Sequence, residues 1–412
     1  MTFSATSKKV LDKSKVVVYI CHMRYIHRKL EQQLKKASRA FPVIMLTGPR
    51  RSGKTTLLQK CFPDASYYLL EDPDIIDRVK NDPRSFLEDI RLPAILDEIQ
   101  NTPELLNYIR TKVDYSGKRR CQWILTGSQE PALMKDVGES MAGRAAIFHL
   151  LPLSRPETEK VTILKGGFPE AIAQPAHADT WFRSYIQTYL ERDIRSVSSI
   201  RDLTTFRKFL ALVASHIGQV LNRTEISTPL GVSVPTVSEW LGILEATHQI
   251  ILVPPFFENF GKRLIKSPKL YFTDTGLASY LLGIESEHSL IGSPFYGALF
   301  ESFVVSEISK AQLNASKRRD IYYFRDRQGL EVDFLIPLGD KRLALIEAKA
   351  SRTIRPADAA PIVRLEKAVL RKYTVESFVV HIPVRALQGI SALQKGVKAA
   401  SYDDIPRILG IK

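Results

Sequence analysis

One segment constrains this chain more than any other, because it fits the phosphate-binding pattern G-x-x-x-x-G-K-[ST]. The pattern consists of Gly48, Pro49, Arg50, Arg51, Ser52, Gly53, Lys54 and Thr55. The apolar residues 43–46 before it predict a buried strand, and residues 56–60 after it predict the start of a helix. A strand, a loop and a helix in this order are the context that the pattern needs, so we expect a phosphate-binding loop (the P-loop) here.

The residue types in the P-loop indicate what binds there. Gly48 and Gly53 let the backbone curl without a Cβ clash, so the N–H groups of the loop and the following helix N-terminus face an anion. Lys54 can reach the β- and γ-phosphates of a nucleotide, and the Thr55 hydroxyl can bind Mg²⁺. We therefore predict ATP and Mg²⁺ as cofactors, bound by the P-loop residues and by Thr56.

The remainder of the first 160 residues predicts the fold class. Further strand-like runs alternate with helical segments, which indicates an α/β fold with a parallel sheet. These runs are residues 67–70, 93–98 and 123–128. Ligands of such sheets bind at the carboxyl ends of the strands. Asp97, Glu98 and Ser128 end predicted strands, so we expect them to lie beside the P-loop.

Asp97 and Glu98 follow the P-loop by about 40 residues. Adjacent carboxylates at a buried strand end repel each other, and a bound dication explains them better than stability does. We predict that Asp97 holds the Mg²⁺ shell and that Glu98 polarises the attacking water. The alternative is an acidic turn after a strand. Ser128, or else Thr126, is the candidate for contacting the γ-phosphate.

Arg144, in Gly143-Arg144-Ala145, is a candidate for stabilising charge during phosphoryl transfer. An arginine supplied in cis or in trans performs this task in related chemistry. Arg192 and Arg195 are rival candidates, and a surface arginine without a catalytic role is the alternative reading of Arg144.

The middle of the chain, residues 166–283, has mainly helical patterns. Residues 225–230 and 234–247 predict two helices around a turn at 231–233, and strand-like segments at 250–253 and 269–272 follow. This order is typical of a helix-turn-helix with a β-wing. It is either a DNA reader or a lid that packs on the P-loop domain.

A second group of charged residues lies near the C-terminus. Asp333 is in one strand-like segment, and Glu347 and Lys349 share one face of the next, because side chains two apart on a strand point the same way. Glu301, on the helix before them, adds a third carboxylate. Such a cluster is costly without a cation, and Mg²⁺ or Mn²⁺ prefers oxygen ligands. A nuclease-like metal site is therefore one reading, and an amphipathic hairpin with exposed charges is the other.

Charge and cysteine content limit the partners and the compartment. The net charge of +15 favours a polyanionic partner such as nucleic acid or an anionic membrane surface. Residues 1–40 hold ten of the basic side chains against two acidic ones, so a solvated basic arm is the alternative. The 3 cysteines are widely spaced, which favours a reducing cytoplasm. No apolar run has the length of about 18 residues that a membrane helix needs, and Met23 is a rival start site.

Several motifs together resemble one known family, the prokaryotic AAA-type P-loop ATPases that are fused to a C-terminal domain of unknown function. The motifs that carry the resemblance are residues 47–56, 96–100, 125–128, 142–144, 151–154, 166–170, 189–194, 272–277 and the block from Glu331 to Lys349.

The resemblance implies an AAA-like core, a winged-helix region and a tail that is similar to PD-(D/E)xK nucleases. In that comparison Glu301, Asp333, Glu347 and Lys349 match the acidic and lysine positions of the nuclease site. The expected domains are a basic extension at 1–23, the ATPase at 24–160, the lid and winged helix at 161–290 and the nuclease-like tail at 291–412.

We therefore expect a cytoplasmic Mg²⁺-dependent ATPase that acts on or near DNA. Cleavage of DNA by the tail is a separate hypothesis. A third hypothesis is a nucleotide-gated regulator or scaffold whose C-terminal domain binds a partner without cutting nucleic acid. AAA-type cores often form rings, so a homo-oligomer is expected, and no membrane partner is.

Overall fold

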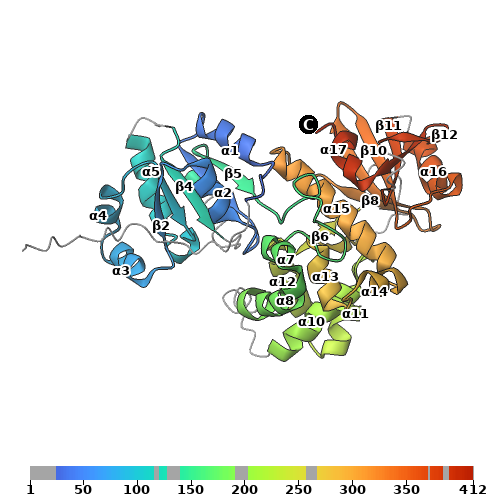
Figure 1. Ribbon diagram of the computed structural model, residues 1–412, viewed down its shortest axis with the longest axis horizontal. Helices are drawn as coiled ribbons and strands as arrows, with labels where there is room; N and C mark the ends of the chain where they lie inside the picture. Colours follow the sequence, from blue (N-terminus) through green and yellow to red (C-terminus); the bar gives the residue numbers. More distant parts are fainter. Residues whose placement is uncertain are drawn as a thin grey trace, which may run out of the picture.

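The computed structural model describes residues 25–115, 120–127, 140–190, 203–256, 267–369, 372–383 and 389–411. Figure 1 shows a sheet domain (blue to teal) on one side of the molecule. The middle helices (green to yellow) and a second sheet domain (orange to red) lie on the other side. The long helix α15 (Tyr296–Asn314) runs between these parts and contacts strands of all three sheets.

The first sheet is parallel and has the order β2-β3-β4-β1-β5. Its strands are β1 (Val43–Thr47), β2 (Ser66–Leu69), β3 (Ala94–Asp97), β4 (Trp123–Gly127) and β5 (Ala145–His149). Every residue of β1, β3 and β4 is buried, as expected for strands that are covered on both faces. The predicted α/β class with a parallel sheet is confirmed.

Five helices accompany this sheet in the part of the chain that the structure describes. They are α1 (Glu31–Ser38), α2 (Lys54–Cys61), α3 (Pro73–Asn81), α4 (Pro83–Glu88) and α5 (Leu105–Tyr115). Helix α2 begins at Lys54, within the P-loop pattern, so the loop connects the carboxyl end of β1 to a helix N-terminus. Helices α3 and α4 each begin with a proline after an aspartate cap, which satisfies their first N–H groups.

The middle region contains helices and one small antiparallel sheet. Its helices are α7 (Pro169–Ala173), α8 (Ala178–Tyr185), α10 (Leu203–Ser215), α11 (Arg223–Leu230), α12 (Val234–Ala246), α13 (Thr275–Leu281) and α14 (Glu287–Gly292). Strands β6 (Ile250–Val253) and β7 (Lys269–Phe272) pair with each other. Helices α11 and α12 lie where the sequence predicts them, and Ser233 caps α12 through the Thr236 N–H.

The C-terminal domain has a mixed sheet of order β12-β13-β11-β10-β9-β8. The strands are β8 (Tyr322–Arg325), β9 (Glu331–Gly339), β10 (Arg342–Lys349), β11 (Thr374–His381), β12 (Ser391–Gln394) and β13 (Val397–Ser401). Helices α16 (Ala360–Val369) and α17 (Ile405–Ile408) lie in the same domain. No helix among the described residues is both long and apolar enough to cross a membrane.

Candidate functional site

The P-loop has the backbone conformation that a phosphate cradle needs. Gly48 and Gly53 have φ values of 145° and 93°, in the left-handed region that glycine tolerates. A Cβ atom at Gly48 would lie 2.2 Å from the carbonyl oxygen of Leu150, so no larger residue fits there. Arg51 also has a positive φ of 62°, and the loop therefore curls tightly between β1 and α2.

The ammonium group of Lys54 lies inside this curled loop. Its Nζ donates to the carbonyl oxygens of Gly48 and Pro49, each at 3.0 Å, and the residue is only 5% exposed. The carbonyl oxygens offset part of the cost of removing the charge from water. A phosphate that enters the loop meets this ammonium and the N–H groups at the start of α2.

Asp97, at the end of β3, is fixed by three hydroxyl groups. Its carboxylate accepts from Thr55 Oγ1 at 2.6 Å, from Tyr67 OH at 2.8 Å and from Thr126 Oγ1 at 2.7 Å. Burial, together with the negative charge of Asp97, raises the pKa of Tyr67, which keeps the phenol protonated as a donor. The predicted meeting of Thr55 and Asp97 is therefore observed, and their adjacent oxygens fit a Mg²⁺ ion.

Glu98 follows with an unusual backbone. Its φ and ψ of 62° and 50° are left-handed, which costs a residue with a Cβ of the order of 1 kcal/mol. The carboxylate accepts a hydrogen bond from the Gln100 side chain. Strain of this kind concentrates at functional sites, so the conformation supports a chemical role for Glu98.

Arg28 binds the backbone of the P-loop through its side chain, and the sequence analysis did not identify this residue. Its guanidinium donates to the carbonyl oxygens of Ser52 at 2.8 Å and Leu151 at 2.6 Å, and to Glu157 Oε1 at 3.1 Å. Both side chains of this ion pair are almost fully buried. Arg28 precedes α1 and lies outside every local motif, so only the folded chain reveals its role.

The middle region contacts the mouth of the P-loop. Glu170, on α7, forms an ion pair with Arg51 at 3.7 Å. A Cβ added to Gly53 would come within 4.0 Å of the ring of Pro169. Helix α7 therefore lies close to the predicted phosphate site, and burial raises the pKa of Glu170.

A pair of histidines links the end of β1 to the middle region. Thr47 Oγ1 and His149 Nδ1 are 2.7 Å apart, and the rings of His149 and His248 are 5.4 Å apart. Burial first, and then the charges of His149, Arg319 and Lys54, lower the pKa of His248 to about 3. His248 keeps some exposed surface, but its Nε2 is shielded from solvent and has no hydrogen-bond partner. Both rings are neutral near pH 7.

The structure describes the predicted arginine of the ATP site but not the predicted serine. Arg144 precedes β5, and its guanidinium binds both carboxylate oxygens of Asp114 at 2.7 and 2.8 Å. It lies at the amino end of β5, whereas the P-loop follows the carboxyl end of β1, so Arg144 does not meet the phosphate site of its own chain. Ser128 lies outside the described residues, as do Arg192 and Arg195.

The second acidic group is assembled around a lysine that the sequence reasoning did not single out. Lys269 Nζ contacts Glu331 and lies 3.7 Å from Glu301 Oε2 and 3.6 Å from Asp333 Oδ1. Tyr271 donates to the same Glu301 oxygen at 3.0 Å. Among the described residues, no group of His, Cys, Asp and Glu side chains is arranged to hold a metal ion.

Glu347 and Lys349 lie beside this cluster. Lys349 Nζ is 2.8 Å from Glu347 Oε1, whereas Glu347 Oε2 is buried without a hydrogen-bond partner. Asp333 and Glu347 line one surface hollow of about 320 Å³. Burial and the charge of Asp333 raise the pKa values of Glu347 and Glu301 above the ordinary value of a glutamate.

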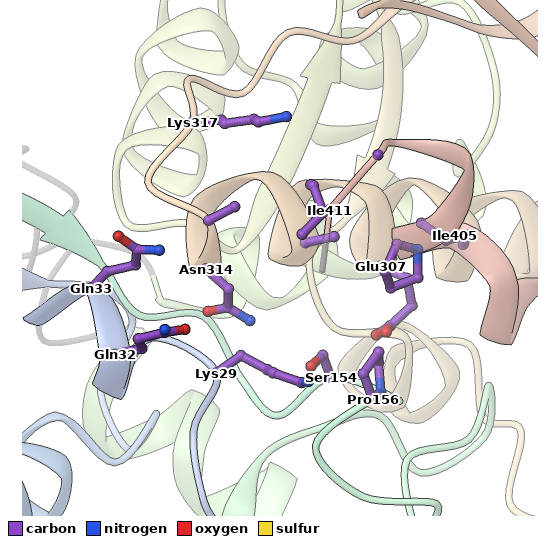
Figure 2. Close-up of a pocket in the computed structure, with 14 residues that line it drawn as sticks. Lys29, Gln32, Gln33, Ser154, Pro156, Glu307, Asn314, Lys317, Ile405 and Ile411 are labelled. Carbon is purple, nitrogen blue, oxygen red and sulfur yellow. The ribbon is translucent and has the colours of Figure 1, made fainter.

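A separate cavity of about 360 Å³ lies between the first and last domains. Figure 2 shows that Gln32, Gln33 and Lys29 line one side of it, while Asn314 and Glu307 come from α15. No P-loop residue lines this cavity. It is therefore distinct from the phosphate site.

Comparison with known proteins assigns the first domain. Residues 40–159 match the family model of the AAA domain. The chain is 30% identical over 321 residues to an uncharacterized protein of Mycobacterium bovis and, with the same values, to one of Mycobacterium tuberculosis. Each match covers 76% of this chain and 72% of the relative. The chain belongs to the family of these proteins. With its AAA domain, it is a P-loop ATPase by class.

The other parts of the chain match families without an assigned role. Residues 158–288 match a domain of unknown function (DUF8612), and residues 296–388 match another (DUF4143). A solved structure, that of a Walker-type ATPase of Pyrococcus abyssi, is 16% identical with a TM-score of 0.44. That match covers 62% of this chain and 96% of the other.

Proposed function

We propose that this protein hydrolyses ATP with Mg²⁺ at the P-loop. The observation that carries the proposal is the hydrogen bond of 2.6 Å between Thr55 and Asp97, beside the buried ammonium of Lys54. A P-loop hydroxyl and a carboxylate from a neighbouring strand are the oxygen donors that hold Mg²⁺ in this class of site. The match of residues 40–159 to the AAA domain supports the same proposal.

Each side chain has a distinct task in this proposal. Lys54 leaves the carbonyl oxygens of Gly48 and Pro49 and binds the β- and γ-phosphates. Thr55 and Asp97 hold Mg²⁺, which supplies positive charge against the developing negative charge of the phosphates. Glu98 orients and polarises the attacking water. Arg28 holds the loop in place through Ser52 and touches no substrate.

Phosphate release tests the proposal directly. We expect Lys54→Ala and Glu98→Gln each to reduce turnover by at least 100-fold, because each removes a group that stabilises the transition state. Lys60→Ala, an exposed residue on the same helix, is the matched control and keeps wild-type turnover. Turnover near the wild-type value in both Lys54→Ala and Glu98→Gln would remove the hydrolase assignment.

For the middle region, we favour the lid over the DNA reader. Helix α12 would be the recognition helix, yet it contains no lysine or arginine to neutralise phosphate charge. Its buried residues, such as Val237, Trp240 and Leu241, pack in the core of the middle region. The ion pair between Glu170 of α7 and Arg51 of the P-loop supports the same choice.

DNA remains a candidate partner because of the net charge of +15. Titration of DNA binding against salt concentration tests it. Phosphate contacts make log K fall with log salt by about 0.9 for each contact. Measurable binding with such a slope supports action on DNA. No binding at low salt supports the regulator or scaffold.

We also propose that the chain assembles with copies of itself. Arg144 lies at the far end of the sheet from its own P-loop, so it can contribute to catalysis only at the site of a neighbouring chain. Light scattering with and without a non-hydrolysable ATP analogue tests this proposal. A larger mass with the analogue supports it, and a monomer under both conditions contradicts it.

For the C-terminal domain, we favour partner binding without cleavage of nucleic acid. The cluster of Glu301, Glu331 and Asp333 already surrounds the Lys269 ammonium and does not fit a metal ion as it stands. Incubation with branched and linear DNA in Mg²⁺ or Mn²⁺ tests this choice. We expect no cleavage, and cleavage that is lost in Asp333→Asn would restore the nuclease prediction.

A further inference from the structure

Strand β7 presents two polar side chains to the C-terminal domain. Lys269 and Tyr271 are two residues apart, so they share one face of the strand. Both reach Glu301 on α15, the tyrosine at 3.0 Å and the lysine at 3.7 Å from the same carboxylate oxygen. Backbone groups of Phe272 also bind Ser302 on α15, so the strand is docked along this helix.

The Lys269 ammonium lies among carboxylates that come from two elements. Glu301 belongs to α15, whereas Glu331 and Asp333 belong to β9 and are two residues apart on it. Lys269 is 2% exposed, and its Nζ also lies 5.8 Å from the centre of the Tyr323 ring. Glu331 contacts the ammonium directly, whereas the Glu301 and Asp333 oxygens lie at ion-pair distances of 3.7 and 3.6 Å.

Electrostatics keep this lysine charged. Burial alone would lower its pKa, but Asp333, Glu301 and Glu331 outweigh the burial and raise the pKa of Lys269 above its ordinary value. The ammonium contacts Glu331 and lies within 3.7 Å of Glu301 and Asp333, so it supplies the counter-charge for the same oxygens that a divalent ion would need.

Two further oxygens of the predicted metal set accept hydrogen bonds. Asp333 Oδ2 accepts the backbone N–H of Ala348 at 2.9 Å, and Glu347 Oε1 binds Lys349 at 2.8 Å. Glu347 Oε2 is buried and has no hydrogen-bond partner. The ammonium groups of Lys269 and Lys349 thus already supply positive charge to all three carboxylates of the predicted set, which are Glu301, Asp333 and Glu347.

We propose that Lys269 is the resident cation of this carboxylate cluster, that it excludes divalent metal ions, and that it locks β7 of the middle region onto the C-terminal domain. The predicted nuclease-like site is thus an ionic joint between two domains. Removing the ammonium leaves Glu301 and Asp333 without this cation, while Glu331 keeps its ion pair with Arg325 at 3.3 Å, and a divalent ion then becomes the best available counter-charge for the cluster.

Lys269→Met tests the proposal, because methionine keeps much of the side-chain stem and removes the charge. The full-length protein carries Asp97→Asn throughout, so that Mn²⁺ at the P-loop site does not contribute. Thermal unfolding and Mn²⁺ electron paramagnetic resonance are measured without nucleotide. We expect Lys269→Met to unfold at a lower temperature without Mn²⁺, to recover with Mn²⁺, and to bind Mn²⁺ at least tenfold more tightly than the Lys269 protein.

Three control variants test whether loss of the Lys269 charge causes the tighter Mn²⁺ binding. Adding Asp333→Asn to Lys269→Met abolishes the gain in Mn²⁺ binding, and Lys269→Arg, which keeps the charge, shows no gain. Lys398→Met removes an exposed lysine that lies near Glu376 and the Phe378 ring, and it also shows no gain.

Two results would overturn the proposal. One is Mn²⁺ binding by the Lys269 protein that Asp333→Asn weakens, which needs no lysine variant and stands even if Lys269→Met fails to fold. The other is a folded Lys269→Met protein without tighter Mn²⁺ binding. The ATPase assignment is measured separately by phosphate release, and neither result bears on it.

Discussion

At the scale of single residues, the sequence reveals the functional residues that lie in local motifs and misses those whose partners are distant along the chain. Lys54, Thr55 and Asp97 were predictable, because a loop pattern and a strand end are local features. Arg28 and Lys269 were not, because their partners lie far along the chain: Arg28 binds Glu157, and Lys269 binds Asp333. Such roles depend on the folded arrangement of domains and have no local pattern.

Arg28 gives the first prediction at this scale. Arg28→Ala leaves Glu157 buried without its cation, and breaking such a pair costs about 3–5 kcal/mol. We expect a loss of that size in urea unfolding, together with weaker ATP binding, because the Ser52 carbonyl loses its donor. Arg39→Ala, at an exposed position, is the control. A loss below about 1 kcal/mol would contradict the role of Arg28.

His248 gives a prediction about pH. Its folded-state pKa of about 3 lies below the value of about 6.5 in the unfolded chain. The unfolded state therefore binds the proton first, and stability falls as the pH drops below about 6.5, by up to about 1.4 kcal/mol per unit. His149 also contributes to the loss of stability at low pH, because its pKa is lowered in the folded protein as well.

Urea unfolding at pH 7, 6 and 5 measures this effect. We expect His248→Asn to show a shallower dependence on pH than the wild type, because asparagine does not titrate and tolerates the positive φ of 56°. His27→Asn, whose side chain is 86% exposed, keeps the wild-type dependence. An unchanged slope in His248→Asn would contradict the burial of that ring.

At the scale of elements, the sequence predicts those that have local signals. Strands β1 to β4 of the first sheet and the β6–β7 pair are apolar runs bounded by polar, glycine or proline residues, and they lie within about one residue of the predicted limits. Strands β5, β11, β12 and β13 were not predicted. Strand β11 is parallel to β10 and β13, and such pairing depends on residues that are distant in sequence.

Helix α13 gives a prediction at this scale. Asp274 caps it by accepting from the Leu277 N–H at 3.1 Å, and it also accepts from the Gly167 N–H at 2.6 Å. Asp274→Ala leaves both buried donors unsatisfied, so we expect a loss of roughly 2–5 kcal/mol in urea unfolding. Asn222→Ala removes the exposed cap of α11 and costs about 1 kcal/mol. Equal losses in the two variants would contradict this account.

At the scale of the whole molecule, residues 151–157, which follow the first sheet, contact both the P-loop domain and helix α15. Arg28 ties the Leu151 carbonyl and Glu157 to the P-loop, and Arg155 donates its backbone N–H to Glu307 of α15 at 2.8 Å. Lys310 neutralises Glu307 and also binds the Leu153 carbonyl. A continuous set of contacts therefore connects the phosphate site to the C-terminal domain.

The central claim is that a nucleotide binds at Lys54 with Mg²⁺ held by Thr55 and Asp97. Equilibrium titration with fluorescent ATP and Mg²⁺ tests it most directly. The account predicts that Glu98→Gln binds about as tightly as the wild type, because Glu98 acts on the attacking water, while Lys54→Ala binds at least 100-fold more weakly. Binding by Lys54→Ala that equals the wild type would contradict the account.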